Sequence, residues 1–398
     1  MTEKKILILT SDTGGGHTSA ARALEAGLNV CASGATYLVH IAKAMEENGV
    51  LTERLGSVYN YLLRHRQHYV KYYHWAINRF RPDKWQLVYR FGTHYGRQLV
   101  GRFGPNVIVS VHPMMQAFFA RLLKELDLAD QIPLVTVVTD PCGNSWKGWA
   151  DDGVRLYLVA HEEARHELIS YGVSEERIRI CGMPIHPKFE DVARTPEVRE
   201  AVLSEFELDP GKFTILVNAG WVGGGNIPEL FKKLVGEDLP VQAIFVAGRN
   251  DALRREAEER ARSARFPVRV VGYTDQMDRL MCSSNVMVSK LGGLTTFEAL
   301  ACGLPIIGDS VTRPMPQEER TAAMLERAGA AMMINSVPDV VTAVRRVALD
   351  PVEYQALRDS AIRLGIPDAT RRIVAEIEQL SAAGTPALGG PVAALSKR

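Results

Sequence analysis

The chain lacks several features that would place it in a specialised class of protein. Its 398 residues include five cysteines, Cys31, Cys142, Cys181, Cys282 and Cys302, and no two of them lie within four residues of each other. That spacing excludes the CxxC motifs of zinc and redox sites, and the odd number argues against a disulfide framework. No run of about 18 uncharged apolar residues occurs, so we expect no helix that crosses a membrane.

The chain also lacks an excess of either charge. It has 47 lysines and arginines against 46 aspartates and glutamates, a net charge of +1, which excludes binding to nucleic acids through bulk charge. Hydrophobic residues make up 46% and charged residues 23%, which excludes wholesale disorder. The apolar run Ile6–Leu9 is too short for a signal peptide, so we expect a cytoplasmic protein.

What the sequence does contain is a regular alternation of short aliphatic runs and amphipathic stretches. The aliphatic runs are nearly continuous, as in parallel strands that are buried on both faces. We predict strands at Ile6–Leu9, Val107–Val111, Leu134–Val138, Leu156–Val159, Thr214–Val217, Ala243–Val246, Val268–Val271, Val286–Val288 and Pro305–Ile307. We predict helices at Ser19–Leu28, Ala160–Tyr171, Glu197–Phe206 and Arg254–Ser263. This alternation predicts an α/β fold of doubly wound, Rossmann-like parallel sheets.

The length and a proline-rich stretch predict two domains. At roughly 150 residues per domain, the chain is long enough for two separate cores. Four prolines between Pro184 and Pro210 mark a boundary. We therefore expect an amino-terminal domain over residues 1–186 and a carboxyl-terminal domain over residues 187–381. Residues 382–398 are rich in alanine, glycine and proline, and we expect them to form a flexible tail.

The segment from Tyr59 to Phe103 differs from the rest of the chain. It holds 12 of the 29 aromatic residues, and residues 54–102 contain ten lysines and arginines but one acid, Asp83. Basic residues interleaved with tyrosine and tryptophan suit the surface of an anionic membrane. A helical insertion with inward-packed rings and solvated charges is one alternative, and stacking on single-stranded nucleic acid is another. We expect contact with anionic membrane lipids and no nucleic-acid partner.

A glycine-rich turn, TSDTGGGH over residues 10–17, joins the first predicted strand to the first predicted helix. Its glycines allow backbone N–H groups to approach a ligand, and the start of a helix favours negative charge. The turn is neither a Walker A loop, because no Gly-Lys-Ser/Thr follows, nor a good dinucleotide fingerprint. The positive end of the helix lowers the pKa of His17, which predicts a neutral base. A ligand-free turn with a structural histidine is the alternative.

Two similar turns follow strands in the second half of the chain. NAGWVGGGN occupies residues 218–226, and SKLGGLTTFEA occupies residues 289–299. The second turn places a carboxylate, Glu298, in the first turns of a helix. Such a carboxylate can accept hydrogen bonds from both hydroxyls of a ribose while the N–H groups of the turn face a diphosphate. Glycine-rich turns in both α/β halves indicate a nucleotide-sugar enzyme.

These motifs and several others, in the same order along the chain, resemble one family of glycosyltransferases. The chain resembles the monogalactosyldiacylglycerol synthases and the bacterial processive diacylglycerol glucosyltransferases. More remotely, it resembles the N-acetylglucosaminyltransferase that makes lipid II. The matching stretches are SDTGGGH (11–17), VHPMMQ (111–116), VTD (138–140), GMPI (182–185), GRN (248–250), GYTDQM (272–277), KLGGLTTFE (290–298) and PQEE (316–319).

The resemblance implies a GT-B fold, in which two doubly wound, Rossmann-like domains face each other across a cleft. It implies that the amino-terminal domain takes the lipid acceptor and the carboxyl-terminal domain takes the UDP-sugar. The implied reaction is an inverting transfer of a hexose to diacylglycerol, which yields a β-glycosyl diacylglycerol. The implied partners are UDP-glucose or UDP-galactose as donor, diacylglycerol as acceptor and the anionic lipids of the cytoplasmic face of the cell membrane. No cofactor is implied.

The resemblance also implies roles for particular residues. His17 takes the position of the proposed base, and Asp12 and Asp140 accompany it in the acceptor cleft. The implied acceptor-binding residues are Gly14, Gly15, Gly16, His112 and Met114. The implied donor-binding residues are Gly220, Arg249, Tyr273, Thr274, Met277, Lys290, Gly292, Gly293, Leu294, Thr295, Glu298, Gln317 and Glu318.

Within the donor set, the resemblance places Tyr273 and Thr274 at the uracil edge and Glu298 on the ribose diol. It places residues 293–295 beside the diphosphate, and Gln317 and Glu318 on the hydroxyls of the sugar. No Asp-x-Asp triplet occurs in the chain, so we expect a metal-independent reaction. Turn N–H groups and helix N-termini can then neutralise the departing UDP.

Three positions depart from the pattern of the family. His186 stands where many relatives have arginine, Leu291 where they have proline or alanine, and Trp221 where they keep a small residue. A histidine is only partly charged near neutral pH, and a large ring reshapes a donor site. The identity of the sugar, glucose or galactose, therefore stays open.

Two other functions are compatible with the same motifs. UDP-N-acetylglucosamine 2-epimerases also pair two such domains and bind UDP-sugars, but they need no membrane surface. A non-catalytic protein that binds a UDP-sugar is the second alternative, and the presence of His17, Asp140 and Glu298 argues against it.

Overall fold

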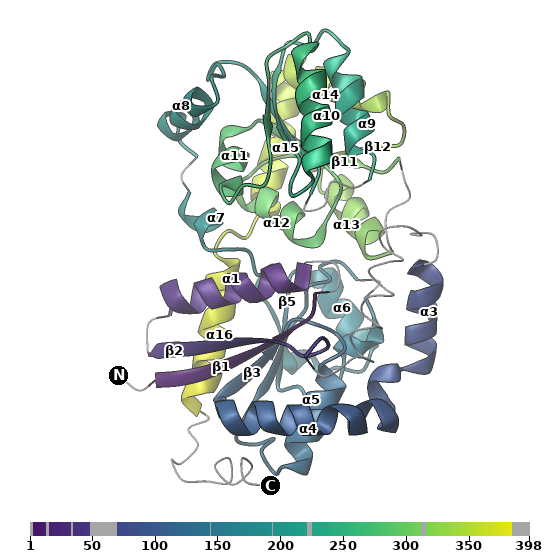
Figure 1. The fold of residues 1–398 in the computed structure, drawn as a ribbon, viewed down its shortest axis with the longest axis vertical. Helices are drawn as coiled ribbons and strands as arrows, with labels where there is room; N and C mark the ends of the chain where they lie inside the picture. The colour runs from purple at the N-terminus through teal and green to yellow at the C-terminus, as the bar shows by residue number, and fades with distance from the viewer. Residues whose placement is uncertain are drawn as a thin grey trace. The chain divides into compact units, whose positions relative to one another are not determined.

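Each half of the chain forms a parallel sheet of six strands (Figure 1). The computed structural model describes residues 3–12, 16–32, 35–47, 70–143, 145–192, 194–220, 225–311 and 316–383. The first sheet has the strand order β2-β1-β3-β4-β5-β6, and the second has the order β12-β11-β10-β7-β8-β9. All neighbouring strands in both sheets run parallel.

The first half of the chain contributes the first sheet and the helices around it. Its strands are β1 (Glu3–Thr10), β2 (Thr36–Lys43), β3 (Val107–Ser110), β4 (Leu134–Val137), β5 (Leu156–Val159) and β6 (Ile178–Ile180). Its α-helices are α1 (Gly16–Val30), α3 (Val70–Phe80), α4 (Gln86–Phe103), α5 (Gln116–Glu125) and α6 (Glu162–Ser170). Three short 3₁₀ helices are η2 (Pro82–Lys84), η3 (Lys147–Trp149) and η4 (Glu175–Arg177).

The second half builds the other sheet in the same way. Its strands are β7 (Thr214–Asn218), β8 (Gln242–Val246), β9 (Val268–Val271), β10 (Val286–Ser289), β11 (Ile306–Asp309) and β12 (Ala331–Ile334). Its helices are α7 (Lys188–Asp191), α8 (Pro196–Glu205), α9 (Ile227–Val235), α10 (Asp251–Arg262), α11 (Met277–Ser283), α12 (Gly293–Ala301), α13 (Pro316–Arg327), α14 (Asp339–Leu349) and α15 (Pro351–Leu364). The last helix of the chain is α16 (Ala369–Ala383).

All nine predicted strands are present, and three further strands were not predicted. The three are β2, β6 and β12, and each lies at an edge of its sheet. An edge strand has one neighbour only, so it need not be apolar on every residue. In β2, exposed and partly buried residues alternate, and Leu38 is 45% exposed. The central strands, such as the fully buried Ile6–Leu9, show the continuous apolar run that the prediction relied on.

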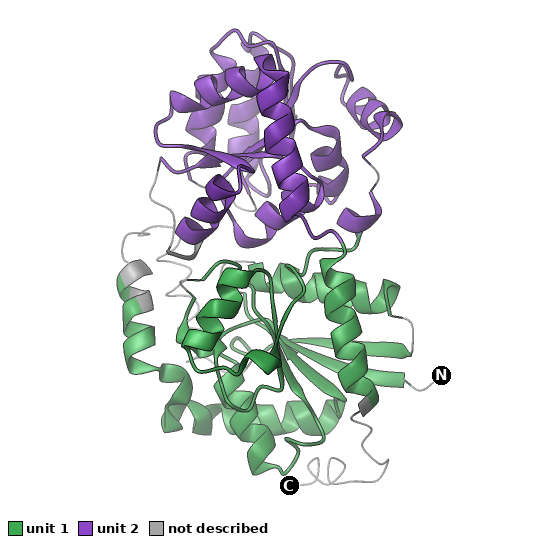
Figure 2. Ribbon diagram, turned by 180° about the vertical axis from the view of Figure 1, so that it is seen from behind, with its two compact units in different colours: residues 1–187, 315–317, 368–398 green, residues 188–314, 318–367 purple. Residues whose placement is uncertain are grey.

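The chain divides into two compact units (Figure 2). The first consists of residues 1–187, 315–317 and 368–398, and the second of residues 188–314 and 318–367. This division differs from the expected domains at α16, which we had assigned to the second domain. The predicted tail, apart from residues 382 and 383, lies outside the described residues.

Helix α16 joins the first unit through close contacts with α1 and with the first sheet. A side chain at Gly27 of α1 would collide with Thr370, so the missing Cβ lets the two helices approach. The hydroxyl of Thr370 donates a hydrogen bond to the carbonyl oxygen of Ile185, and Lys4 Nζ donates to the carbonyl oxygen of Ser381 at 2.9 Å. These contacts join sequence-distant segments, which is why a linear boundary did not predict them.

Candidate active site

The strand order of the first unit fixes where its functional residues gather. Strand β1 lies between β2 and β3, so the next strand in the chain, β2, is added on one side of β1 and the following strand, β3, on the other side. In open parallel sheets, ligands bind outside the carboxyl ends of the strands at such a reversal. The glycine-rich turn follows β1 and His112 follows β3, so both lie at this point.

His17 lies in the first turn of α1 and contacts the segment that follows β3. Its Nδ1 lies 2.7 Å from the carbonyl oxygen of Val111 and 3.0 Å from Oγ1 of Thr139. Because a carbonyl oxygen can only accept, Nδ1 carries the proton, and Nε2 of the neutral ring keeps its lone pair. Burial lowers the pKa of His17 to about 4, and the hydrogen bond to Val111 opposes this in part. The arrangement therefore holds a neutral base at Nε2.

His112 packs edge-on against His17, with ring centroids 4.5 Å apart and an interplanar angle of 71°. The backbone N–H of Met114 donates to Nδ1 of His112 at 3.3 Å, which leaves the proton of this ring on Nε2. Burial lowers the pKa of His112 well below its usual value, and the neighbouring His17 lowers it further. The two rings therefore form a neutral pair.

Asp140 joins this group through a tryptophan. It lies in the segment after β4, the strand next to β3, and its Oδ2 accepts a hydrogen bond of 2.6 Å from Nε1 of Trp149. The Trp149 ring is fully buried, and its centroid lies 6.3 Å from that of His17. The first unit thus brings His17, His112 and Asp140 to one end of its sheet. No role was predicted for Trp149 or Thr139, because the only sign of a role in the sequence is that both residues follow β4.

The other acceptor-side residues are placed differently. Asp12 accepts from Lys43 Nζ at 2.7 Å and from Thr18 Oγ1 at 3.0 Å, contacts that anchor the start of the glycine-rich turn. Gly16 begins α1, and a Cβ there would meet no atom within 4 Å. Met114 is partly buried against the core of the first unit. Gly14 and Gly15 lie outside the described residues.

The second unit repeats the reversal of strand order. Strand β7 lies between β8 and β10, so the turn after β7 and the turn after β10 meet at one edge of the sheet. Gly220 follows β7 with φ of +75°, and its N–H donates to Oδ1 of Asn218 at 2.9 Å. A Cβ on Gly220 would lie 3.6 Å from Cε of Lys290, in the turn after β10. The positive φ and this close approach explain why glycine stands there.

Asp309 holds the far end of the same turn. Its carboxylate accepts from the backbone N–H and from Nδ2 of Asn226, all at 3.2 Å, and from the N–H of Val311 at 3.0 Å. These bonds fix the start of α9 beside Lys290. Sequence analysis missed Asp309, although its position at the end of a predicted strand was a usable signal.

The first turn of α12 presents backbone N–H groups without a side-chain cap. Its N-cap is Gly292, which makes no capping hydrogen bond, and a Cβ at Gly292 would meet no atom within 4 Å. A side chain at the N-cap would therefore meet open space. An uncapped helix start of this kind attracts phosphate, and the Lys290 side chain lies next to it in the sequence.

Glu298 lies two turns into α12 and is the most perturbed carboxylate of the second unit among the described residues. No hydrogen-bond donor among the described residues contacts its carboxylate. Burial raises the pKa of Glu298 from its usual 4.5 to about 7, with Lys188 opposing the shift and Asp278 adding to it. Lys188 is itself paired with Asp278 at 3.3 Å. A half-buried carboxylate without a donor is suited to accept hydrogen bonds from a hydroxylated ligand.

An exposed aromatic ring and an arginine, both predicted to bind the donor, contact each other. The guanidinium of Arg249 lies 4.4 Å from the centre of the Tyr273 ring, and this ring is 54% exposed. The hydroxyl of Thr274 accepts from the N–H of Gln276 at 3.0 Å, which fixes the turn before α11. Met277 is the first residue of α11 and is partly buried.

The remaining predicted donor residues divide between described and undescribed positions. Leu294 is buried and Thr295 partly buried in α12, and Glu318 is partly buried in α13. The side chain of Gln317 and the whole of Trp221 lie outside the described residues. Leu291 is buried, and a Cβ on Gly308 would lie 3.4 Å from its Cδ2, so this departure from the family pattern fills the core of the second unit. His186 is exposed.

Comparisons with known proteins cover both halves of the chain. Residues 17–185 match the family model of monogalactosyldiacylglycerol (MGDG) synthase, and residues 226–347 match that of glycosyl transferases group 1. A processive diacylglycerol β-glucosyltransferase of Bacillus pumilus is 27% identical over 96% of both chains. A probable monogalactosyldiacylglycerol synthase 3 of Oryza sativa subsp. japonica is 29% identical over 95% of this chain and 75% of its own.

The chain is similar over nearly its whole length to the MGDG synthases and the processive diacylglycerol glucosyltransferases. Its fold is confirmed as GT-B. MurG of Acinetobacter baumannii superposes with a TM-score of 0.63 at 13% identity, over 94% of this chain and 99% of that one. A UDP-GlcNAc 2-epimerase of Neisseria meningitidis superposes with a TM-score of 0.59, also at 13% identity, over 94% of this chain and 100% of that one. At such identities the likeness concerns the fold alone.

The raised pKa of Glu298 predicts a stability cost that this glycosyltransferase carries without a ligand. Between pH 4.5 and about 7, the Glu298 carboxyl group ionises in the unfolded state but resists ionisation in the folded state. The free energy of unfolding therefore falls as the pH rises through this range. Replacing Glu298 with glutamine removes the charge and keeps the shape. At about pH 8 we expect the variant to unfold with a free energy higher by about 1–3 kcal/mol, measured by denaturant titration.

The gain should shrink to less than half near pH 5, because most of the cost accumulates as the pH rises from 5 to the folded-state pKa of about 7. Glu326→Gln, which changes an exposed carboxylate on α13, serves as the control and should alter stability little at either pH. If Glu298→Gln is equally or less stable than the wild type at the higher pH, the carboxylate is not held in an unfavourable environment.

Proposed function

We propose that this protein transfers a hexose from a UDP-sugar to the free hydroxyl of diacylglycerol and forms a β-glycosyl diacylglycerol. The observation that carries the proposal is the neutral His17, with its lone pair on Nε2, in the half of the chain that matches the MGDG synthase model. Full-length relatives are named as diacylglycerol glucosyltransferases and as MGDG synthases, which supports diacylglycerol as the acceptor and leaves the choice between glucose and galactose open.

The chemistry needs a base on the acceptor side. Nε2 of His17 takes the proton of the acceptor hydroxyl, and the oxygen forms a bond to the anomeric carbon. The bond from this carbon to the β-phosphate oxygen breaks at the same time, and UDP leaves with the electron pair. Attack opposite the leaving group inverts the configuration, so an α-linked donor gives a β-linked product. His112 and Thr139 hold the ring of His17, and the neutral His112 adds no charge that would oppose its protonation.

The chemistry also needs stabilisation of the departing diphosphate. The uncapped N-terminus of α12 supplies N–H groups, and Lys290 supplies a positive charge that no acidic side chain of the described residues neutralises. Glu298 accepts hydrogen bonds from the ribose hydroxyls. The exposed ring of Tyr273 beside Arg249 offers a surface for the uracil ring. These groups act on charge that appears as UDP leaves, which is where stabilisation raises the rate.

We also propose that the first unit docks on anionic membrane lipids. No helix of the described residues is long and apolar enough to cross a bilayer. Instead, six large apolar side chains of α3, α4 and the residue before α4 are 51–64% exposed: Tyr72, Trp75, Phe80, Trp85, Leu87 and Phe91. We call these six residues the apolar patch. Arg79, Lys84 and Arg90 are exposed in the same segment.

Not every aromatic residue of this segment packs inward. Tyr89 does, since it is 5% exposed, donates to Glu125 at 2.7 Å and stacks under Arg121. The patch residues do not, although the Trp75 and Phe80 rings contact each other edge-on at 6.2 Å. Exposed rings with interspersed cations match the headgroup region of a membrane.

A product assay tests the proposed function. Purified protein is incubated with diacylglycerol in vesicles and with radiolabelled UDP-glucose or UDP-galactose, and lipid and aqueous products are separated. We expect label in a glycolipid with at least one of the two donors, and unchanged rates in EDTA. Label that stays in the aqueous phase, as free sugar or as an epimerised UDP-sugar, would contradict the proposal.

A further inference from the structure

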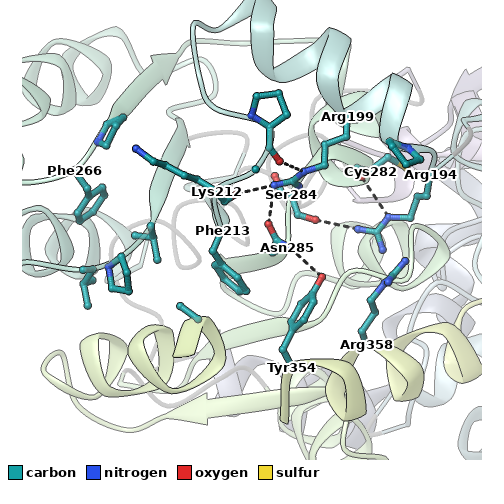
Figure 3. A pocket seen from close by; sticks show the side chains of 18 of the residues that line it. Arg194, Arg199, Lys212, Phe213, Phe266, Cys282, Ser284, Asn285, Tyr354 and Arg358 are labelled. Atoms are coloured by element: carbon teal, nitrogen blue, oxygen red, sulfur yellow. Dashed lines mark hydrogen bonds between the residues drawn. The ribbon is translucent and has the colours of Figure 1, made fainter. Parts of the chain in front are cut away.

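A cavity lies in the second unit, at the end of its strands opposite to the turns that carry Gly220 and Lys290. It has a volume of about 900 Å³ and is lined by residues that precede β7, β8, β9 and β10, among them Phe213, Val241, Pro267 and Asn285 (Figure 3). The turns that carry Lys290 and Gly220 follow β10 and β7. Because the strands are parallel, this cavity is separate from the donor side. Its volume lies in the range of small-molecule sites.

The cavity is strongly cationic. Its lining residues include five with positive side chains, Arg194, Arg199, Lys212, Arg265 and Arg358, and no aspartate or glutamate. Five cations without an acidic counterpart in one concave surface focus a positive potential inside it. Cavities of this composition attract anions, and several arginines together favour phosphate or carboxylate groups.

Two of the arginines are held in place by neutral acceptors only. Arg194 donates to the carbonyl oxygens of Gly303 at 2.6 Å and of Ser284 at 3.0 Å. Arg199 donates to the carbonyl oxygens of Lys212 at 2.7 Å and Pro210 at 3.0 Å. These bonds fix the two guanidinium groups, but they leave the positive charges without a negative partner. Burial lowers the pKa of both arginines accordingly.

Arg358 provides the observation that points to a ligand. Its Nε is buried and has no hydrogen-bond partner among the residues that the structure describes. Its side chain extends toward that of Arg194 (Figure 3), and its charge acts on Arg194 as a like charge. A buried donor without an acceptor, next to another cation, costs free energy that an anionic oxygen between them would recover.

The opposite side of the cavity is apolar. Phe213 and Tyr354 contact edge-on with ring centroids 5.3 Å apart, and Phe266 lies on the side away from Arg194, Arg199 and Arg358 (Figure 3). Pro240 and Pro267 line the same region. The cavity thus offers a cationic end for an anion and an apolar end for a ring or a short chain.

We propose that this cavity binds a small phosphate monoester, with the phosphate between Arg358 and Arg194 and its organic group against Phe213 and Phe266. The proposal does not depend on the glycosyltransferase reaction, because none of these residues lies in the donor or acceptor side. It assigns to the second unit a binding site in addition to the one for the sugar donor.

Phenyl phosphate is a suitable probe, because it combines one phosphate with one ring. Its affinity is measured by calorimetry for the wild type and for the double variant Lys212→Gln/Arg358→Gln, which spares the structural bonds of Arg194 and Arg199. The control is Arg255→Gln/Arg262→Gln, which removes two exposed arginines of α10 outside the cavity. Unfolding midpoints of all three proteins verify that each is folded.

We expect the double variant to bind phenyl phosphate at least tenfold more weakly than the wild type, and the control to stay within twofold. Inorganic phosphate should bind the wild type several-fold more weakly than phenyl phosphate, since it leaves the apolar end empty. Equal affinity of the wild type and the double variant, or no binding to the wild type, would overturn the proposal. A failure of the product assay above would leave this result untouched.

Discussion

Replacement of His17 with alanine is expected to lower the rate of sugar transfer by about 10²- to 10⁴-fold, the range typical of a lost general base. The affinity for UDP should stay close to that of the wild type, because His17 belongs to the first unit and the predicted UDP contacts belong to the second. The rate is measured under saturating donor and the affinity by calorimetry. His166→Ala removes a histidine of the same unit that is 68% exposed, and it should leave both unchanged.

The same residue predicts the acidic limb of the pH profile. A base with a pKa of about 4 is unprotonated throughout the neutral range, and it is lost only as the pH falls toward that value. We therefore expect kcat/KM for the acceptor to stay level down to about pH 5, well below the point where a histidine with the usual pKa would protonate. A His17→Ala variant that keeps more than a third of the wild-type rate would remove His17 from the mechanism.

The second large effect is expected at the membrane. The triple variant Trp75→Ser/Leu87→Ser/Phe91→Ser removes three side chains of the apolar patch that are 61–64% exposed and are therefore not needed for the core. If each contributes about 1 kcal/mol by shallow insertion, partitioning onto anionic vesicles should fall by roughly 100-fold. Binding is measured by co-sedimentation with vesicles of increasing anionic content.

Two further variants, a matched control and a variant that removes three positive charges, test the membrane prediction. Val30→Ser/Leu349→Ser/Val352→Ser removes three other apolar side chains, 63–80% exposed, and should leave vesicle binding within twofold. Arg79→Gln/Lys84→Gln/Arg90→Gln should weaken binding to anionic vesicles by up to about 3 kcal/mol and remove most of its salt dependence. Equal binding to neutral and anionic vesicles, or equal losses in the patch and control variants, would contradict docking through this segment.

The sequence predicted the central architecture well because the signals were local. Buried parallel strands such as β1 and β4 are nearly continuous apolar runs, and the three glycine-rich turns follow β1, β7 and β10 directly. His17, Lys290 and Glu298 could be singled out because each stands next to such a turn. Their placement at a reversal of strand order then follows from the topology of a doubly wound sheet.

What the sequence could not predict depends on contacts between distant segments. The edge strand β2 lacks a continuous apolar run, since one side of it has no neighbouring strand. Helix α16 joins the first unit through Gly27 and Ile185, which lie far from it in the chain. The link from Asp140 to His17 runs through the buried Trp149, and a tryptophan in a short 3₁₀ helix shows no such role by itself.

The cationic cavity is the clearest case of this kind. Arg194, Lys212 and Arg358 are separated by up to 164 residues, and each looks like an ordinary surface cation in the sequence. Only the folded second unit shows that they share one concave surface without an acidic partner. Composition hides such a cluster, because acids elsewhere in the chain bring the net charge to +1.

The central claim is that a base on the acceptor side directs an inverting transfer to diacylglycerol. The most direct test is the anomeric configuration of the lipid product, determined by proton NMR after incubation with an α-linked UDP-hexose and diacylglycerol. Our account predicts a β-glycosyl diacylglycerol, formed by the wild type and nearly absent with His17→Ala. An α-linked glycolipid, or a β-linked product formed at the wild-type rate by His17→Ala, would contradict it.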